Sequence, residues 1–358
     1  MTRYRPDLGA PPEAPGVVPE LLQEYGAATR LAMEDYLVPG AAADTTPSTL
    51  HALLADYPRR GGKMLRPSIC IAHARAFGAT LQEAVLTAAA IELLHNAFLI
   101  HDDIVDGSEE RRERPTLHAL HGVPLALHAG DTLMLLALRP LMDNVGCLGE
   151  RLALAILRET ELMARETAEG QALELEWRDG NRVDVTEADY LTMVLKKTAW
   201  ISTIFPARAG ALIGSGGAVD PWAFVRFGFF LGAAFQIQDD LLNLRAGGTR
   251  YGKERCGDLY EAKRTLILVH ARQACSATDR DSLDGLLTLS REERTAEHVA
   301  WMRDLIERHG SLGYAATVAQ ALSGAALHEY ALAYGALPES RDKAFIGGLA
   351  TWVFERSH

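Results

Sequence analysis

The chain has 358 residues, enough for one large domain or two average ones, and 48% of them are hydrophobic, which is enough for an ample core. A formal net charge of −11 argues against a general nucleic-acid binder, because such proteins need a basic surface. Charged, polar or proline residues interrupt the longest apolar stretches, so the sequence predicts a cytoplasmic protein without stable membrane insertion.

The first twenty residues differ from the rest of the chain. Residues 1–20 are rich in proline and lack the apolar core of a signal peptide, so we expect a flexible lead before a single domain at residues 21–358. Helical periodicity dominates that domain, and no alternating strand pattern, repeat or linker divides it, which favours one all-α domain over two. The predicted helices cover residues 18–37, 47–57, 66–77, 81–106, 124–142, 147–176, 187–213, 221–244, 259–273, 292–308, 311–334 and 341–355.

The four cysteines lie far apart and form no CxxC pair. Most of them fall in helical or apolar surroundings, which favours buried free thiols over disulfides. These residues are Cys70, Cys147, Cys256 and Cys275.

Two of the predicted helices are apolar nearly all round, at residues 85–100 and 222–237, so we expect both inside the protein. Each ends in a group of aspartates, at the end of a helix where the dipole is negative and carboxylates are disfavoured. Asp102 and Asp106 are four residues apart and share one helix face. Asp239 and Asn243 repeat that spacing, with Asp240 beside Asp239.

Carboxylates at a buried helix end repel one another, and a bound multivalent cation compensates this repulsion. Oxygen ligands without a His or Cys chelate suit Mg²⁺, which shares its remaining positions with water and substrate phosphates. Either acidic group alone would be read as a solvated helix end, but two of them, each closing an apolar helix, favour metal binding. If the acidic groups bind Mg²⁺ together with substrate phosphates, the arginines and lysines elsewhere in the chain become candidate diphosphate ligands, because Arg and Lys pair with phosphate oxygens.

The sequence resembles the trans-isoprenyl diphosphate synthases, the polyprenyl synthetase family, from about residue 25 onward. The motifs that carry the resemblance are GGKMLRP, ELLHNAFLIHDDIVD, RRERPT, KKTAW, FQIQDDLLN and YGKERCGDLYEAKRT. The resemblance implies a single-domain, all-α isoprenoid synthase bundle around a deep central cavity, usually a homodimer. It also implies head-to-tail condensation of isopentenyl diphosphate with an allylic diphosphate, as in geranylgeranyl diphosphate synthases.

The resemblance assigns a role to each matched position. Asp102 and Asp106 are implied to bind Mg²⁺ on the allylic diphosphate with Asp103 in support, and Asp239 to hold a further Mg²⁺ beside Asp240, for three ions in all. The residues implied to hold isopentenyl diphosphate are Lys63, Arg66, His95 and Arg112. The residues implied to face the allylic diphosphate are Arg111, Lys197, Thr198, Gln236, Lys253 and Lys263, of which Lys197 and Lys253 are counted as catalytic with the aspartates.

Four positions depart from the family pattern. Asn243 stands where the second motif normally ends in Asp, and we expect it to weaken the metal site modestly. Glu113 replaces a common Gly, Met64 a common Arg, and Glu174 a usual Asp that is expected to reach the metals through water.

Product length is implied by the residues four and five positions before the first motif. Ala97 is small and favours a long product, whereas Phe98 is bulky and favours a short one. Together they favour a C20 product and leave C15 and C25 or longer open. Two other functions stay open: a class I terpene cyclase, which needs no second diphosphate site, and a non-catalytic partner subunit of a heteromeric synthase.

Overall fold

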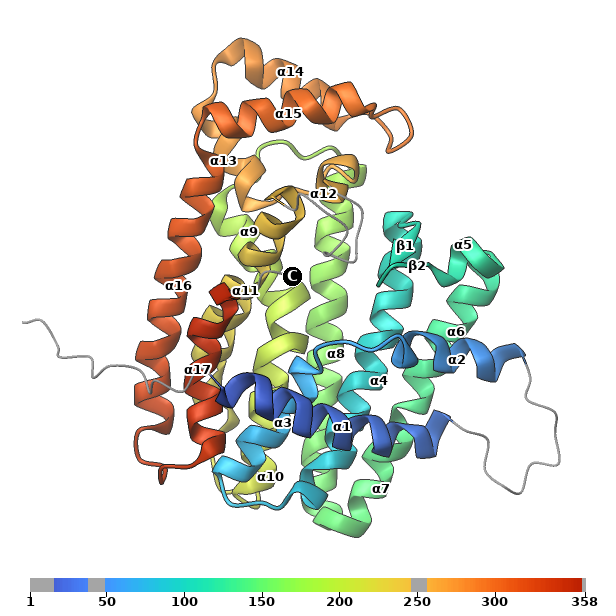
Figure 1. Ribbon diagram of the computed structural model, residues 1–358, viewed down its shortest axis with the longest axis vertical. Coiled ribbons are helices and arrows are strands. Elements are labelled where there is room, and N and C mark those ends of the chain that lie inside the picture. The colour runs from blue at the N-terminus through green and yellow to red at the C-terminus, as the bar shows by residue number, and fades with distance from the viewer. Residues whose placement is uncertain (1–15, 38–48, 246–255, 356–358) are drawn as a thin grey trace, which may run out of the picture.

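The computed structural model describes residues 16–37, 49–245 and 256–355, and these ranges are almost entirely helical (Figure 1). The first half contains α1 (Val17–Leu37), α2 (Thr49–Arg59), α3 (Leu65–Ala76), α4 (Leu81–Asp106), β1 (Glu110–Arg111), β2 (Arg114–Pro115), α5 (Leu117–His121), α6 (Val123–Leu136), α7 (Leu138–Leu148) and α8 (Glu150–Asp179). The second half contains α9 (Glu187–Val194), the π-helix η1 (Leu195–Ile204), α10 (Phe205–Gly214), the 3₁₀ helix η2 (Pro221–Phe224), α11 (Val225–Arg245), α12 (Gly257–Tyr260), α13 (Leu266–Ala274), α14 (Ala277–Leu287), α15 (Ala296–Arg308), α16 (Ser311–Tyr334) and α17 (Arg341–Glu355).

The central helix α4 agrees with the predicted range, 81–106. It begins with a capping box, in which Thr80 accepts from the backbone of Glu83 and Glu83 accepts from the backbone of Thr80. It ends at Gly107, whose φ of 61° is the left-handed conformation that glycine adopts without strain. Its middle is buried, as its apolar sequence predicts, and its last turns carry the first acidic motif to the interior of the bundle.

Most differences from the predicted elements lie where helices break. The predicted helix at 124–142 is two helices, because α7 starts at Leu138 and Pro140 falls in its first turn, where a missing N–H is tolerated. The predicted helix at 259–273 is likewise split into α12 and α13. The hairpin β1–β2, α5 and α14 were not predicted, whereas α1 begins at Val17, one residue before the predicted start of its helix. Cys70, Cys256 and Cys275 are buried free thiols, while Cys147 is exposed.

The predicted helix at 187–213 is continuous but contains the ten-residue π-helix η1, held closely between α8 and α11. Glycines make this close approach possible. A Cβ on Gly170 of α8 would lie 2.1 Å from the backbone nitrogen of Lys197, and one on Gly232 of α11 would lie 2.9 Å from the Cα of Ala199. Wide turns of this kind are frequent at functional sites, and this one carries the KKTAW motif.

We therefore expect Gly170→Ala to lower the free energy of unfolding by about 1–3 kcal/mol, because α8 and η1 must separate to admit the methyl group. Denaturant unfolding measures the loss. The matched control is Gly324→Ala in α16, where an added Cβ meets nothing within 4 Å and alanine should stabilise the helix by up to about 1 kcal/mol. Equal stability of the two variants would contradict the close packing at Gly170.

Candidate functional site

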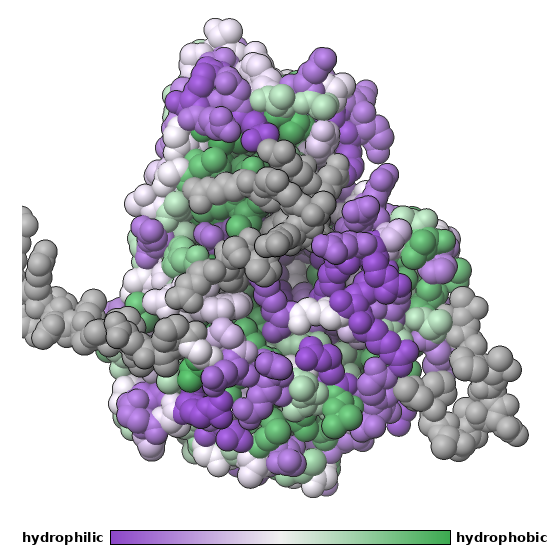
Figure 2. All heavy atoms as spheres, in the orientation of Figure 1, coloured by the Kyte–Doolittle hydropathy of each residue, from purple (hydrophilic) through white to green (hydrophobic). Residues whose placement is uncertain are grey.

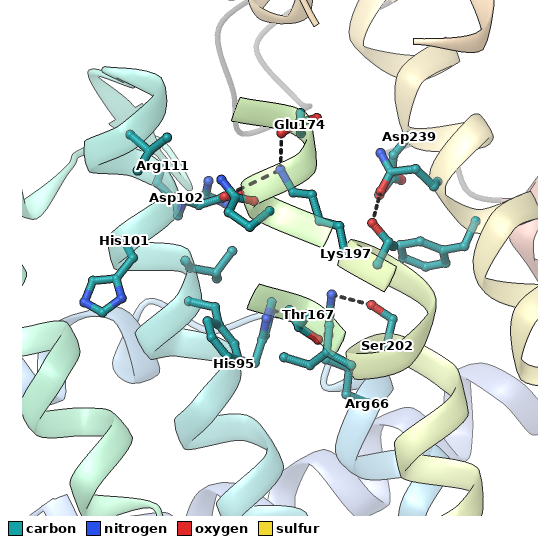
Figure 3. A pocket seen from close by; sticks show the side chains of 18 of the residues that line it. Arg66, His95, His101, Asp102, Arg111, Thr167, Glu174, Lys197, Ser202 and Asp239 are labelled. Atoms are coloured by element: carbon teal, nitrogen blue, oxygen red, sulfur yellow. Dashed lines mark hydrogen bonds and ion pairs between the residues drawn. The ribbon is translucent and has the colours of Figure 1, made fainter. Parts of the chain in front are cut away.

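A cavity of about 1120 Å³ is lined by residues of α4, α8, η1 and α11 and by the segment before α3. Hydrophilic side chains gather around a hollow in the middle of the face shown in Figure 2. In the close view, Asp102 and Asp239 lie on opposite sides of the cavity, and Lys197 lies between them (Figure 3). The two predicted acidic helix ends are thus brought to one site, although Asp102 and Asp239 lie 137 positions apart in the sequence.

The three aspartates of the first acidic motif have different surroundings. Asp102 lines the cavity, with one carboxylate oxygen 3.6 Å from Nζ of Lys197. Asp106 is buried, and its two oxygens pair with Arg178 at 2.7 Å and Lys263 at 2.9 Å. Burial alone would raise the pKa of Asp106, but Lys263 and the other cations nearby hold it well below its usual range. Asp103 is fully buried and accepts hydrogen bonds from Arg111 and Tyr57.

The residues of the second motif also differ in their surroundings. Asp239 and Asp240 both line the cavity, and Asp240 also accepts hydrogen bonds from Gln236 and Tyr190, each at 2.8 Å. Asn243 is 2% exposed and lies outside the residues that line the cavity. Its side-chain oxygen accepts from the backbone N–H of Asp258 at 3.3 Å, so it holds the start of α12.

The cations predicted for one diphosphate lie together at the α3 end of the cavity: Lys63, Arg66, His95 and Arg112. The Arg66 guanidinium lies 3.2 Å from Nε2 of His95 and donates to the Ser202 hydroxyl at 2.8 Å. Burial lowers the pKa of Arg66 to about 10, and burial together with Arg66 lowers the pKa of His95 well below its usual value. His95 is therefore a neutral imidazole at neutral pH.

The second group of predicted cations faces the acidic motifs. Lys197 donates to Glu174 at 2.5 Å, and Lys263 reaches Asp106 and also lines the cavity. Thr198 donates to Gln236 at 2.9 Å, and both line the cavity with Arg111. Lys253 lies outside the described residues.

The hairpin β1–β2 carries the first two arginines of the RRERPT motif, Arg111 and Arg112. Its two-residue loop is Arg112-Glu113, with φ values of 54° and 60°, the pair of left-handed residues that a tight hairpin requires. Glu113 thus occupies a position that favours glycine, the residue common there in the family. Arg60 braces the hairpin by donating to the carbonyl oxygens of Arg111 and Pro115.

The comparisons with known proteins agree with this geometry. The family model described as polyprenyl synthetase matches residues 47–306. The chain belongs to the polyprenyl synthetase family. Over 341 residues it is 34% identical to a short chain isoprenyl diphosphate synthase of Methanothermobacter thermautotrophicus, covering 95% of this chain and 99% of that protein. The chain is thus a trans-isoprenyl diphosphate synthase, a prenyltransferase.

Other relatives differ in the product that their names state. A geranylfarnesyl diphosphate synthase of Natronomonas pharaonis is 34% identical over 83% of this chain and 87% of that protein. The crystal structure of geranylgeranyl pyrophosphate synthetase from Pyrococcus horikoshii has a TM-score of 0.79 and 30% identity, over 94% of this chain and 98% of that one. Family membership therefore leaves the chain length of this synthase's product unassigned.

The family generally depends on divalent metals, and the donor set of this synthase fits such an ion. Within residues 16–37, 49–245 and 256–355, no group of three or more His, Cys, Asp or Glu side chains is placed to hold a metal by itself. Asp102 and Asp239 instead offer single carboxylates from two sides. That arrangement suits Mg²⁺, which is commonly held by one or two carboxylates together with substrate phosphates.

The apolar part of the cavity bears on product length. Phe98 lines it, together with Met134 of α6 and Thr167 of α8. Ala97 is fully buried and lies outside the lining residues, because adjacent positions on a helix point about 100° apart.

Sequence reasoning missed several residues of the synthase's site. Glu92 is 3% exposed and lines the cavity, and it lies one turn before His95 on the same face of α4, a spacing that could have revealed it. Tyr57, Tyr190 and Ser202 gave no comparable signal, because their contacts join segments far apart in the chain.

Proposed function

We propose that the synthase joins isopentenyl diphosphate head to tail to an allylic diphosphate, with Mg²⁺, and makes geranylgeranyl diphosphate. The observation that carries this proposal is the division of one cavity into two charged ends. Opposed aspartates with Lys197 and Lys263 suit a metal-bound diphosphate, while Arg66, His95 and Arg112 suit a second diphosphate without metal.

Asp102 and Asp239 would hold Mg²⁺, and Asp106 is proposed as a further ligand, because a diphosphate can compete for the Lys263 that it contacts. Up to three ions are proposed per site. Mg²⁺ bound there supplies Lewis-acid stabilisation of the charge that develops on the leaving diphosphate. Asn243, by contrast, is proposed to act on α12 and not on the metal.

The synthase's own cations position the two substrates. Lys197, Lys263 and Arg111 orient the allylic diphosphate and stabilise its charge as the allylic C–O bond breaks. Arg66 and its neighbours hold isopentenyl diphosphate so that its alkene attacks the allylic carbon from a fixed position. Loss of a proton, which we propose goes to the departed diphosphate, completes the new double bond.

We propose that Phe98 limits the length of the product. Phe98→Ala is expected to shift the major product from C20 to C25 or longer, because the deleted ring opens the apolar end of the cavity. Chain-length analysis of the hydrolysed products measures the shift. The matched control is Leu94→Ala, one turn further into the core at a residue outside the cavity lining, which should cost stability and leave product length unchanged. An unchanged profile for Phe98→Ala would remove Phe98 from the cavity floor.

We also propose that the synthase is a cytoplasmic homodimer. Large apolar side chains are exposed along α5 to α8, and part of this surface is visible over α5 and α6 at the right of Figure 2. The residues are Leu120, Val123, Leu125, Leu127, Leu135, Leu138, Met142, Val145, Leu154 and Leu157. By length and composition, Leu81–Asp106 and Val123–Leu148 could each cross a membrane. The apolar window of Leu81–Asp106 is 67% buried, as in a core helix. We propose that another copy of the chain covers Val123–Leu148.

Leu135→Asp is expected to convert the dimer to monomer, because a charge at an interface centre must be desolvated without a partner. Light scattering coupled to gel filtration measures the mass. The control is Leu332→Asp on α16, since Leu332 is 69% exposed and Leu135 is 67% exposed, but Leu332 lies outside this surface. A wild-type chain that is monomeric, or a Leu135→Asp variant that stays dimeric, would contradict the proposal.

A further inference from the structure

The two aspartate pairs share a feature that the proposed chemistry does not use. In each pair, the first aspartate, Asp102 or Asp239, lines the cavity; of the second aspartates, Asp240 also borders it and Asp103 does not. The second accepts a hydrogen bond from a buried tyrosine hydroxyl, at 2.5 Å from Tyr57 to Asp103 and at 2.8 Å from Tyr190 to Asp240. The two tyrosines come from different elements, α2 and α9, so the same arrangement is built twice, although Tyr190 also lines the cavity and Tyr57 does not.

On the α4 side, the tyrosine-bound aspartate also holds an arginine of the hairpin. Nε of Arg111 donates to Asp103 at 2.7 Å and a terminal nitrogen donates at 2.6 Å, while the same guanidinium lines the cavity. Asp103 has no exposed surface, so its carboxylate depends on Arg111 and Tyr57 for compensation. The Tyr57 hydroxyl thus fixes the carboxylate that aims Arg111.

On the α11 side, the aspartate holds an amide. One oxygen of Asp240 accepts from Tyr190 and the other from Nε2 of Gln236. Since Nε2 of Gln236 donates to Asp240, this contact fixes which end of the Gln236 amide points to it. The amide oxygen is then directed to the hydroxyl of Thr198, which donates to it at 2.9 Å.

The hydroxyls are suited to act as permanent donors. Burial, assisted by the adjacent carboxylate, raises the pKa of both Tyr57 and Tyr190 above the ordinary value of tyrosine. A purely structural pair of the same kind exists elsewhere in the chain. The Tyr25 hydroxyl donates to the buried Asp342, and neither residue lines the cavity.

We propose that Tyr57 and Tyr190 are positioning residues that hold Asp103 and Asp240 and, through them, orient Arg111 and Gln236 toward the allylic diphosphate. The inference rests on the proposed function of this cavity. It assigns the second aspartate of each pair to the orientation of substrate-contacting side chains and the first to metal binding. Tyr57 also touches the other subsite, since its carbonyl oxygen accepts from Arg112, but that contact belongs to the backbone and survives a change of side chain.

The test compares Tyr57→Phe, Tyr190→Phe and the control Tyr25→Phe in the full-length enzyme with Mg²⁺, isopentenyl diphosphate and farnesyl diphosphate. Each variant loses one hydroxyl that donates to a buried carboxylate, so all three should lose thermal stability. The first two are expected to raise KM for farnesyl diphosphate about tenfold and to leave KM for isopentenyl diphosphate within about twofold. Tyr25→Phe should leave both constants within about twofold.

A double variant adds a second readout. In an Arg111→Lys background, Tyr57→Phe should change KM for farnesyl diphosphate less than about twofold further, because the residue through which it acts is already altered. Phe variants that keep both KM values, as Tyr25→Phe does, would overturn the inference. Should one variant fail to fold, the other decides, since the two tyrosines lie on separate elements. An inactive wild-type enzyme would overturn the proposed function itself.

Discussion

Asp102→Asn is expected to lower kcat about a hundredfold or more and to raise the Mg²⁺ concentration needed for half-maximal activity. The substitution keeps the shape of the side chain and removes the charge that lines the cavity. Lys197 remains anchored by Glu174 at 2.5 Å, so the loss is expected to report on the metal and not on a displaced lysine. Preorganised electrostatic stabilisation of a leaving group commonly has effects of about 10²–10³ in rate.

The measurement is a steady-state rate at several Mg²⁺ concentrations. Asp304→Asn is the matched control, because Asp304 lies on the surface of α15, where it pairs with Arg308. It should retain full activity at every Mg²⁺ concentration. If Asp102→Asn keeps kcat within about threefold, the first motif is not the metal site.

Arg66→Met is expected to raise KM for isopentenyl diphosphate by about tenfold to a hundredfold, with little change in KM for the allylic substrate. Hydrogen bonds to a charged group contribute about 1.5–3 kcal/mol, which corresponds to this range. The guanidinium is braced by His95 and Ser202, so it offers its donors in a fixed orientation. Methionine keeps most of the length of the side chain without the charge.

Separate titrations of the two substrates measure this selectivity. The control is Arg75→Met. Arg75 lies on the same helix, α3, but its guanidinium pairs with Asp342 outside the cavity. Arg75→Met should change neither KM by more than about twofold. An Arg66→Met variant that weakens both substrates equally would mean that the cavity is not divided into two diphosphate subsites.

The sequence was most informative where local patterns decide structure. The range of α4 follows from its capping box, its apolar middle and Gly107, all of which are local. Asp102, Arg66 and His95 could be chosen because their motifs match the family, and the structure brings them to one cavity. The sequence could place the acidic groups at the ends of α4 and α11 in one site only on the assumption that both helices direct them to the same metal ions.

The features that the sequence did not predict depend on contacts between segments far apart in the chain. Nothing near Asp106 in the sequence indicates that Arg178 and Lys263 occupy its oxygens, and nothing near Asp103 indicates Tyr57. The π-helix η1 depends on Gly170 and Gly232 in two other helices, so periodicity alone predicted an ordinary helix there. Asn243 was predicted to weaken the metal site, and nothing near it in the sequence indicates its contact with the backbone N–H of Asp258, fifteen residues away.

The cavity also bears on the two alternative functions. A terpene cyclase needs no second diphosphate site, yet Lys63, Arg66, His95 and Arg112 all line the cavity that contains the aspartates. A non-catalytic partner subunit would have no use for Asp102 and Asp239 on opposite sides of that cavity. Both observations favour a complete synthase site within one chain.

The central claim is most directly tested by incubating the purified protein with Mg²⁺, isopentenyl diphosphate and farnesyl diphosphate, and identifying the hydrolysed products by chain length. The account predicts a linear C20 alcohol that requires both substrates and disappears when the metal is chelated. A cyclic hydrocarbon formed from an allylic diphosphate alone, or no elongation at any Mg²⁺ concentration, would contradict it.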